Sequence, residues 1–153
     1  MKPVLWFRIV AGLLLLFAIG HTIGFLTFQP PTLEGQNVWK AMNTVRFSAG
    51  TSSFSYGDFY TGFGLFITAF QLFAAWLAWS LGSMARREAP SARAIALGMS
   101  ILQLFSLALS LRYFSAGPAI LSGLTAACLI IAATSSDSNA GQIATKPLAT
   151  IDA

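Results

Sequence analysis

The sequence predicts an all-α fold, a four-helix transmembrane bundle with a short amphipathic interfacial helix in its first loop. Hydrophobic residues make up 56% of the 153 residues and charged residues only 9%, whereas a soluble domain carries about 25% charged residues. The apolar residues also gather in long blocks rather than alternating with polar ones. Because roughly 20 helical residues cross the hydrocarbon core of a bilayer, these blocks indicate that lipid is the solvent.

Four blocks have the length and composition of membrane spans, at about residues 4–28, 58–81, 92–111 and 117–133. Prolines after the first block end its helix, because proline lacks the amide donor and restricts the residue before it. We therefore expect one membrane domain over residues 1–133 and a disordered, small and polar tail over 134–153. The basic start of the chain also allows a cleaved signal peptide, although the first block is long for one.

The loop after the first block combines apolar and polar residues at helical spacing. Val38, Met42 and Val45 recur at steps of four and three between Leu33 and Phe47, and Trp39 accompanies them. This pattern is typical of a short amphipathic helix lying at a membrane surface. The following residues 48–53 are small and polar, so we expect a flexible turn there.

The basic residues predict the orientation of the four spans. If the chain crosses the membrane four times, its two termini and the second loop lie on one side, with six of the nine Lys and Arg residues: Lys2, Arg8, Arg86, Arg87, Arg93 and Lys146. The first and third loops carry three: Lys40, Arg46 and Arg112. The excess predicts that both termini are cytoplasmic.

Several function classes find no support in the residues. No basic run with interleaved aromatics suits nucleic acid. Cys128 is the one cysteine and His21 the one histidine, so an intrachain disulfide, a CxxC redox pair and bis-histidine haem ligation within the chain are excluded. Ligation of haem by His21 and a methionine such as Met42 stays conceivable, but no spacing argues for it. We expect no metal and no cofactor.

Small and polar residues follow one face of the second and third blocks. The second block carries Thr61, Gly64, Thr68, Gln71, Ala75 and Ala78, and the third carries Ala96, Ser100, Gln103, Ser106 and Ser110. Because lipid gives helices no hydrophobic reason to associate, such faces promote packing, here against each other or around the bundle centre. Alternatively, Gln71 and Gln103 contact a ligand near the middle of the membrane.

Ionisable groups gather at one predicted level, near the outer ends of the spans. Inserting such a group at the centre of a membrane helix costs about 2.5–3.5 kcal/mol, so each one needs a structural or functional explanation. We expect a polar cluster there, in which an Asp–Arg pair braces the helices and the histidine exchanges a proton. Alternatively, each residue has a separate structural role, as a first-turn charge, an interfacial anchor or an interhelical hydrogen bond. The candidates are His21, Asp58, Arg112, Arg46 and Tyr60.

Short motifs in the first half of the chain carry a family resemblance. They are Gly20-His21-Thr22, Trp39-x-x-Met42, Arg46-Phe47 and Asp58-Phe59-Tyr60-x-Gly62-Phe63-Gly64. Over residues 5–115 the chain resembles a family of small, uncharacterised bacterial membrane proteins. The resemblance implies a four-helix inner-membrane protein whose motif includes the histidine and the aspartate. In architecture alone, the chain is also similar to four-helix proteins of the DoxX type.

These observations predict an integral membrane protein that is not an enzyme and that binds a small apolar ligand, a lipid or a partner protein. The amphipathic loop around Trp39 would belong to the partner surface. One alternative is a membrane enzyme that uses His21 and Asp58 as acid and base on a lipid-like substrate. Another is a small transporter subunit that works as a homo-oligomer, because four helices cannot enclose a wide pore.

Overall fold

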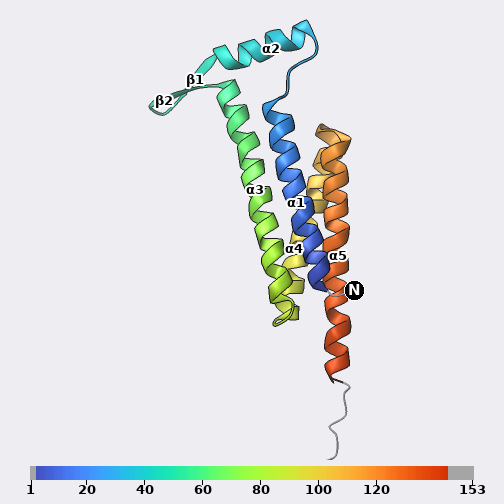
Figure 1. Ribbon diagram of the computed structural model, residues 1–153. Helices are drawn as coiled ribbons and strands as arrows, with labels where there is room; N and C mark the ends of the chain where they lie inside the picture. The colour runs from blue at the N-terminus through green and yellow to red at the C-terminus, as the bar shows by residue number, and fades with distance from the viewer. Residues whose placement is uncertain (1–2, 145–153) are drawn as a thin grey trace, which may run out of the picture. The chain divides into compact units, whose positions relative to one another are not determined.

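The computed structural model describes residues 3–144, with side chains through residue 135. Within that range the fold is all-α, as predicted, with five helices and one short hairpin (Figure 1). The elements are α1 (Pro3–Leu26), α2 (Leu33–Thr44), β1 (Arg46–Ala49), β2 (Ser52–Ser55), α3 (Tyr56–Met84), α4 (Ala89–Tyr113) and α5 (Ala116–Ala144).

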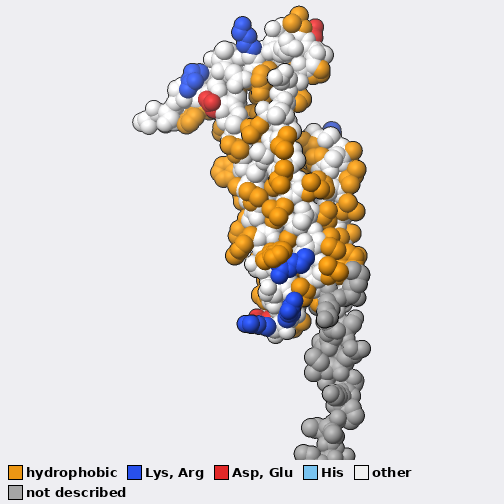
Figure 2. Space-filling model, in the orientation of Figure 1, with side chains coloured by type: hydrophobic (Ala, Val, Ile, Leu, Met, Phe, Trp, Pro, Cys, Tyr) orange, Lys and Arg blue, Asp and Glu red, His pale blue; other side chains and the backbone are white. Residues whose placement is uncertain are grey.

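Four of these helices are long and apolar enough to cross a membrane: α1, α3, α4 and residues Ala116–Ser135 of α5. The chain is therefore a multi-pass membrane protein. Hydrophobic side chains cover the sides of the long helices (Figure 2), and large ones such as Phe70, Ile101 and Leu111 are 66–72% exposed. Exposure on this scale suits lipid, which solvates apolar side chains.

The helices begin and end near the predicted limits, with two differences. Helix α4 begins at Ala89 rather than near residue 92, because Pro90 lies in its first turn, where the missing amide donor has no partner to lose. Helix α5 continues to Ala144, so residues 134–144 of the predicted disordered tail are helical. The rest of that predicted tail, residues 145–153, lies outside the described residues.

The chain divides into two units, which are described separately. One comprises Met1–Leu15 and Ala74–Ala153 and is named the paired-helix unit; the other comprises Leu16–Phe73 and is named the hairpin unit.

The core of the paired-helix unit is built largely from alanine. Helices α4 and α5 are joined by a short connection at Phe114 and Ser115, so they run antiparallel. Small side chains let these helices approach closely, as expected for helices in lipid. The buried set contains Phe7, Val10, Leu14, Ala75, Ala78, Leu81, Ala92, Ala96, Met99, Leu129 and Ala132. Ser100, Gln103 and Ser110 of the predicted polar face of α4 are also buried.

The hairpin unit consists of the second half of α1, then α2, the two strands and the first half of α3. Helix α2 runs across the ends of α1 and α3 (Figure 1). Its N-cap is Thr32, whose hydroxyl accepts a hydrogen bond from the Gly35 amide at 3.1 Å. The predicted amphipathic helix is present, but it ends at Thr44 rather than near residue 47, because Arg46 begins a strand.

The flexible turn predicted over residues 48–53 is a turn at residues 50 and 51 alone, and the residues on either side of it belong to two strands. Strands β1 and β2 pair antiparallel, with Ala49 opposite Ser52, so Gly50 and Thr51 form a two-residue loop. Gly50 has φ of 62°, the conformation that glycine adopts at the first central position of a type II′ turn. Phe47 and Phe54 are paired across the two strands, each two residues from the strand end at the turn. Their ring centroids are 6.4 Å apart.

Candidate functional site

Asp58 belongs to a capping box at the start of α3. Its carboxylate Oδ2 accepts a hydrogen bond from the Ser55 amide at 2.8 Å, and the Asp58 amide donates to the Ser55 hydroxyl at 3.0 Å. Ser55 is the residue before the helix and Asp58 is its third residue, the reciprocal arrangement of a Ser-x-x-Glu box with aspartate in place of glutamate. The carboxylate thus satisfies a backbone donor and lies at the positive end of the helix dipole.

His21 joins α1 to α3 inside the hairpin unit. Its Nε2 lies 3.1 Å from the carbonyl oxygen of Gly64. Because a carbonyl oxygen only accepts, Nε2 carries the hydrogen and donates it, which leaves Nδ1 as the acceptor nitrogen in the neutral ring. The ring of Phe25 stacks on the His21 ring at 5.7 Å, with an angle of 4° between the planes.

Gly64 makes this approach possible. A Cβ atom at position 64 would overlap the ring of Phe25. One turn along α3, the hydroxyls of Thr22 and Thr68 lie 2.8 Å apart, and the Thr22 hydroxyl donates to the Ala18 carbonyl at 2.7 Å. The Thr68 hydroxyl in turn lies 3.4 Å from the Gly64 carbonyl of its own helix, to which it donates. Gly64 and Thr68 belong to the predicted small and polar face, and here these two residues contact α1.

Aromatic rings continue this seam to α2. Phe25 contacts Tyr60 of α3 at 5.2 Å, and Tyr60 contacts Trp39 of α2 at 5.6 Å in an edge-to-face arrangement. Trp39 in turn lies 6.3 Å from Phe28. Edge-to-face and tilted pairs of this kind stabilise by about 0.5–1.5 kcal/mol beyond the burial of their area. Three motifs of the sequence thus meet through side-chain contacts: the histidine motif, Trp39 and the motif that begins at Asp58.

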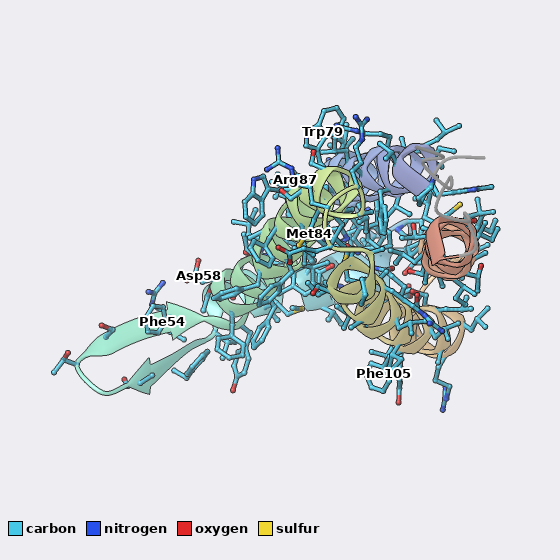
Figure 3. The ribbon with its side chains drawn as sticks, turned by 90° about the horizontal axis from the view of Figure 1, so that it is seen from below. Phe54, Asp58, Trp79, Met84, Arg87 and Phe105 are labelled. Atoms are coloured by element: carbon cyan, nitrogen blue, oxygen red, sulfur yellow. The ribbon has the colours of Figure 1, made fainter. Side chains whose placement is uncertain are left out.

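A groove lies between the hairpin and the start of α3. Its volume is about 330 Å³, within the range of small-molecule sites. Its lining is almost wholly apolar, with phenylalanines from the hairpin and from α3, and Asp58 is its one charged residue. The lining residues are Phe47, Ala49, Phe54, Asp58, Phe59, Gly62, Phe63 and Phe66. The groove is named the aromatic groove. Figure 3 shows Phe54 on the hairpin and Asp58 near the start of α3.

Arg46 is the first residue of β1 and lies next to the aromatic groove. Its Nε and Nη2 donate to the Ser53 hydroxyl and carbonyl at 3.1 and 2.6 Å, which fixes the guanidinium against the neighbouring strand. Its charge acts on the Asp58 carboxylate, although the two form no direct ion pair within the described chain. Figure 2 shows a basic and an acidic side chain close together beside the hairpin.

The five residues of the predicted polar cluster belong to two units, which are described separately. His21, Asp58, Arg46 and Tyr60 belong to the hairpin unit, but His21 and Asp58 have separate partners. Arg112 belongs to the paired-helix unit, where its guanidinium lies 5.2 Å from the ring of Tyr113.

The two candidate mid-membrane glutamines belong to different units, and both are buried. Gln71 is 7% exposed, in the hairpin unit. Gln103 is 2% exposed, in the paired-helix unit, and its Oε1 has no hydrogen-bond partner among the described residues. Ser122 of α5 is fully buried, and its hydroxyl likewise has no partner in that range.

Sequence reasoning missed two features. The aromatic groove depends on the hairpin, whose signal in the sequence is the pair of phenylalanines at equal distances from Gly50-Thr51. The second feature is Arg8, whose guanidinium lies over the ring of Trp79 at 3.1 Å from its centre. A Trp face stabilises a cation that has left water, which gives Arg8 a partner within the paired-helix unit.

Comparison with known proteins adds no assignment: no protein-family model matches the chain, and no curated protein or solved structure matches it. Among the described residues, no three His, Cys, Asp or Glu side chains lie close enough together to hold a metal ion.

Proposed function

We propose that this protein binds a lipid-like apolar ligand in the aromatic groove, without acting as an enzyme. The observation that carries the proposal is the groove itself. It has the volume of a ligand site, and aromatic side chains from the hairpin and from α3 line it. Apolar walls with a small number of polar groups at defined places are the usual features of a ligand pocket.

The architecture around the groove supports binding rather than chemistry. The groove's carboxylate, Asp58, is already engaged by the Ser55 amide. His21 is engaged by the Gly64 carbonyl and the ring of Phe25. No contact in the described chain brings these two groups together as an acid and a base. The enzyme and the oligomeric transporter subunit therefore stay as alternatives that no structural observation favours.

We place the protein in a bacterial inner membrane with both termini in the cytoplasm, a proposal supported by the excess of Lys and Arg on one side of the predicted spans. The hairpin unit, which carries Lys40 and Arg46, would then face outward. The family resemblance of the histidine and Asp58 motifs is consistent with this location. Fusions of periplasmic and cytoplasmic reporter enzymes to residue 45 and to the C-terminus would test it, and activity of the cytoplasmic reporter at residue 45 would contradict it.

The test of ligand binding uses glycines that have free space beside them. A Cβ atom at Gly62 meets nothing within 4 Å, and Gly62 lines the groove, so Gly62→Leu places a side chain inside it. Gly98 of α4 is also exposed with nothing within 4 Å of a Cβ atom, so Gly98→Leu is the matched control. Native mass spectrometry of the detergent-purified protein then records retained small molecules.

We expect the wild-type protein and Gly98→Leu to retain a species of lipid mass, and Gly62→Leu to lose most of it. Equal retention by all three proteins would show that the groove is not the binding site.

A further inference from the structure

One charge lines the aromatic groove and an opposite one lies beside it: Asp58 is a lining residue at the start of α3, and Arg46 of β1 directly precedes the lining residue Phe47. Asp58 is exposed near the start of α3, and its Oδ1 makes no hydrogen bond within the described residues. Arg46 uses Nε and Nη2 on Ser53, so its Nη1 is free within that same range. The charges are near each other but not directly paired, so a ligand with one positive and one negative group can bind both.

Below the charges, phenylalanines follow one face of α3. They are Phe59, Phe63, Phe66, Phe70 and Phe73, at steps of four, three, four and three, and each is 53–66% exposed. The first three line the groove. From Phe59 to Phe70 the helix rises about 16 Å, at about 1.5 Å per residue. Half of the hydrocarbon core of a bilayer is about 15 Å, so the part of the stripe from Phe59 to Phe70 matches the depth of one leaflet.

The direction of the stripe fits a phospholipid. Asp58 lies at the end of α3 where the candidate span starts, and Arg46 lies on β1, the first strand of the hairpin that leads into α3. In a bilayer this end of the span would lie near the lipid head groups, and the stripe would descend from it into the apolar region. An acyl chain that enters the groove between Phe54 and Phe63 would continue along Phe66 and Phe70. Its contacts would be made with rigid rings, which lose little conformational freedom when a chain packs against them.

We infer that the aromatic groove holds a zwitterionic phospholipid with a primary ammonium head group, of the phosphatidylethanolamine class. This inference rests on the proposed function and names its ligand. The Arg46 guanidinium contacts the phosphate, because guanidinium and phosphate form strong charge-assisted hydrogen bonds. The Asp58 carboxylate accepts a hydrogen bond from the ammonium through Oδ1, while Oδ2 keeps its bond to the Ser55 amide.

The same geometry distinguishes between head groups. A phosphatidylcholine head group has no N–H to donate, so it loses the hydrogen bond to Asp58. A phosphatidylglycerol head group carries a net negative charge and no cation, so Asp58 repels it while Arg46 attracts it. An exposed ion pair changes binding by up to about fivefold, so we expect roughly a threefold preference for the ethanolamine lipid over either of the others.

The experiment is a competition between three lipids with identical acyl chains, one of each head group. The lipids are added in equal amounts to the delipidated, detergent-purified protein, and native mass spectrometry gives the ratio of bound species. The variant Asp58→Asn removes the charge but keeps an oxygen that accepts from the Ser55 amide. Glu34→Gln, which removes an exposed charge from α2 in the same unit, is the matched control.

We expect the wild-type protein and Glu34→Gln to prefer the ethanolamine lipid about threefold, and Asp58→Asn to bind ethanolamine and choline lipids equally. Equal binding of the three lipids by the wild-type protein, a measurement that needs no variant, would overturn the head-group assignment. So would a preference for phosphatidylglycerol. If Gly62→Leu still lowers lipid retention in either case, the groove remains a lipid site and only the head-group assignment fails.

Discussion

His21 Nε2 and the carbonyl oxygen of Gly64 lie 3.1 Å apart, and this contact joins α1 to α3 in the hairpin unit. Phe25 takes part in this contact, because its ring stacks on His21 and occupies the space where a side chain at position 64 would lie. A glycine, an imidazole and a phenyl ring therefore form one packing arrangement. The histidine and the glycine belong to two of the four short motifs found in the sequence.

Gly64→Ala should destabilise the protein, because its Cβ atom overlaps the Phe25 ring and the ring must move off His21. Overpacking of this kind costs about 1–3 kcal/mol, more than the roughly 1 kcal/mol that alanine gains over glycine in a helix. Gly62→Ala is the matched control, since a Cβ atom there meets nothing within 4 Å. Thermal unfolding in detergent, followed by circular dichroism, should give a lower Tm for Gly64→Ala and no loss for Gly62→Ala; equal Tm values would contradict the packing argument.

Two substitutions of His21 separate its hydrogen bond from its ring. Gln places an amide donor near the position of Nε2 but has no ring, whereas Phe keeps a ring to stack on Phe25 and has no donor. Interhelical hydrogen bonds in membrane proteins contribute about 0.6 kcal/mol on average, and aromatic pairs about 0.5–1.5 kcal/mol. We therefore expect both variants to lower the Tm by similar small amounts and His21→Ala to lower it more than either. If His21→Ala unfolds at the wild-type temperature, the contact has no structural role.

The sequence was sufficient to predict the spans, because lipid is the solvent that best accommodates apolar blocks of about 20 residues in a chain with so few charges. It also identified the face of α3 that contains Gly64 and Thr68, since steps of three and four mark one side of a helix. Spacing alone does not identify the partner of a face, and the contact of Thr68 proved to be Thr22 of α1.

The hairpin and the role of Asp58 were harder to predict, for different physical reasons. Strands of four residues produce almost no periodic signal, and the run of serines around Gly50 has the composition of a flexible turn. The capping box could have been predicted, because Ser55-x-x-Asp58 before an apolar run is its sequence signature. A carboxylate in a membrane protein suggests a functional role, whereas here the hydrogen bonds with the Ser55 amide and hydroxyl account for the position of Asp58.

Thr22 and Thr68 should be energetically coupled. The two hydroxyls lie 2.8 Å apart, so Thr22→Val and Thr68→Val each remove the hydrogen bond between them with little change in volume. Each substitution also removes a bond to a carbonyl of its own helix, and the cycle cancels these separate losses. A double-mutant cycle on the free energy of unfolding should give a coupling of about 0.6 kcal/mol, the average for such bonds. Thr27, the residue directly after α1, donates its hydroxyl to the Ile23 carbonyl of that helix and provides the control: Thr27→Val combined with Thr68→Val should be additive.

Ser55→Ala should loosen the first turn of α3. The substitution removes the hydroxyl that accepts the Asp58 amide, and loss of a serine N-cap costs about 1 kcal/mol. Because Ser55 is 2% exposed, little water can replace the lost acceptor. Hydrogen-exchange mass spectrometry should show faster exchange at the start of α3 and unchanged exchange over the rest of that helix. Ser48→Ala, at an exposed position of β1, should leave the start of α3 as protected as in the wild-type protein. Equal exchange at the start of α3 in the two variants would show that the capping box does not stabilise the helix. The aromatic groove, which depends on this turn, would then have to be held in place by other contacts.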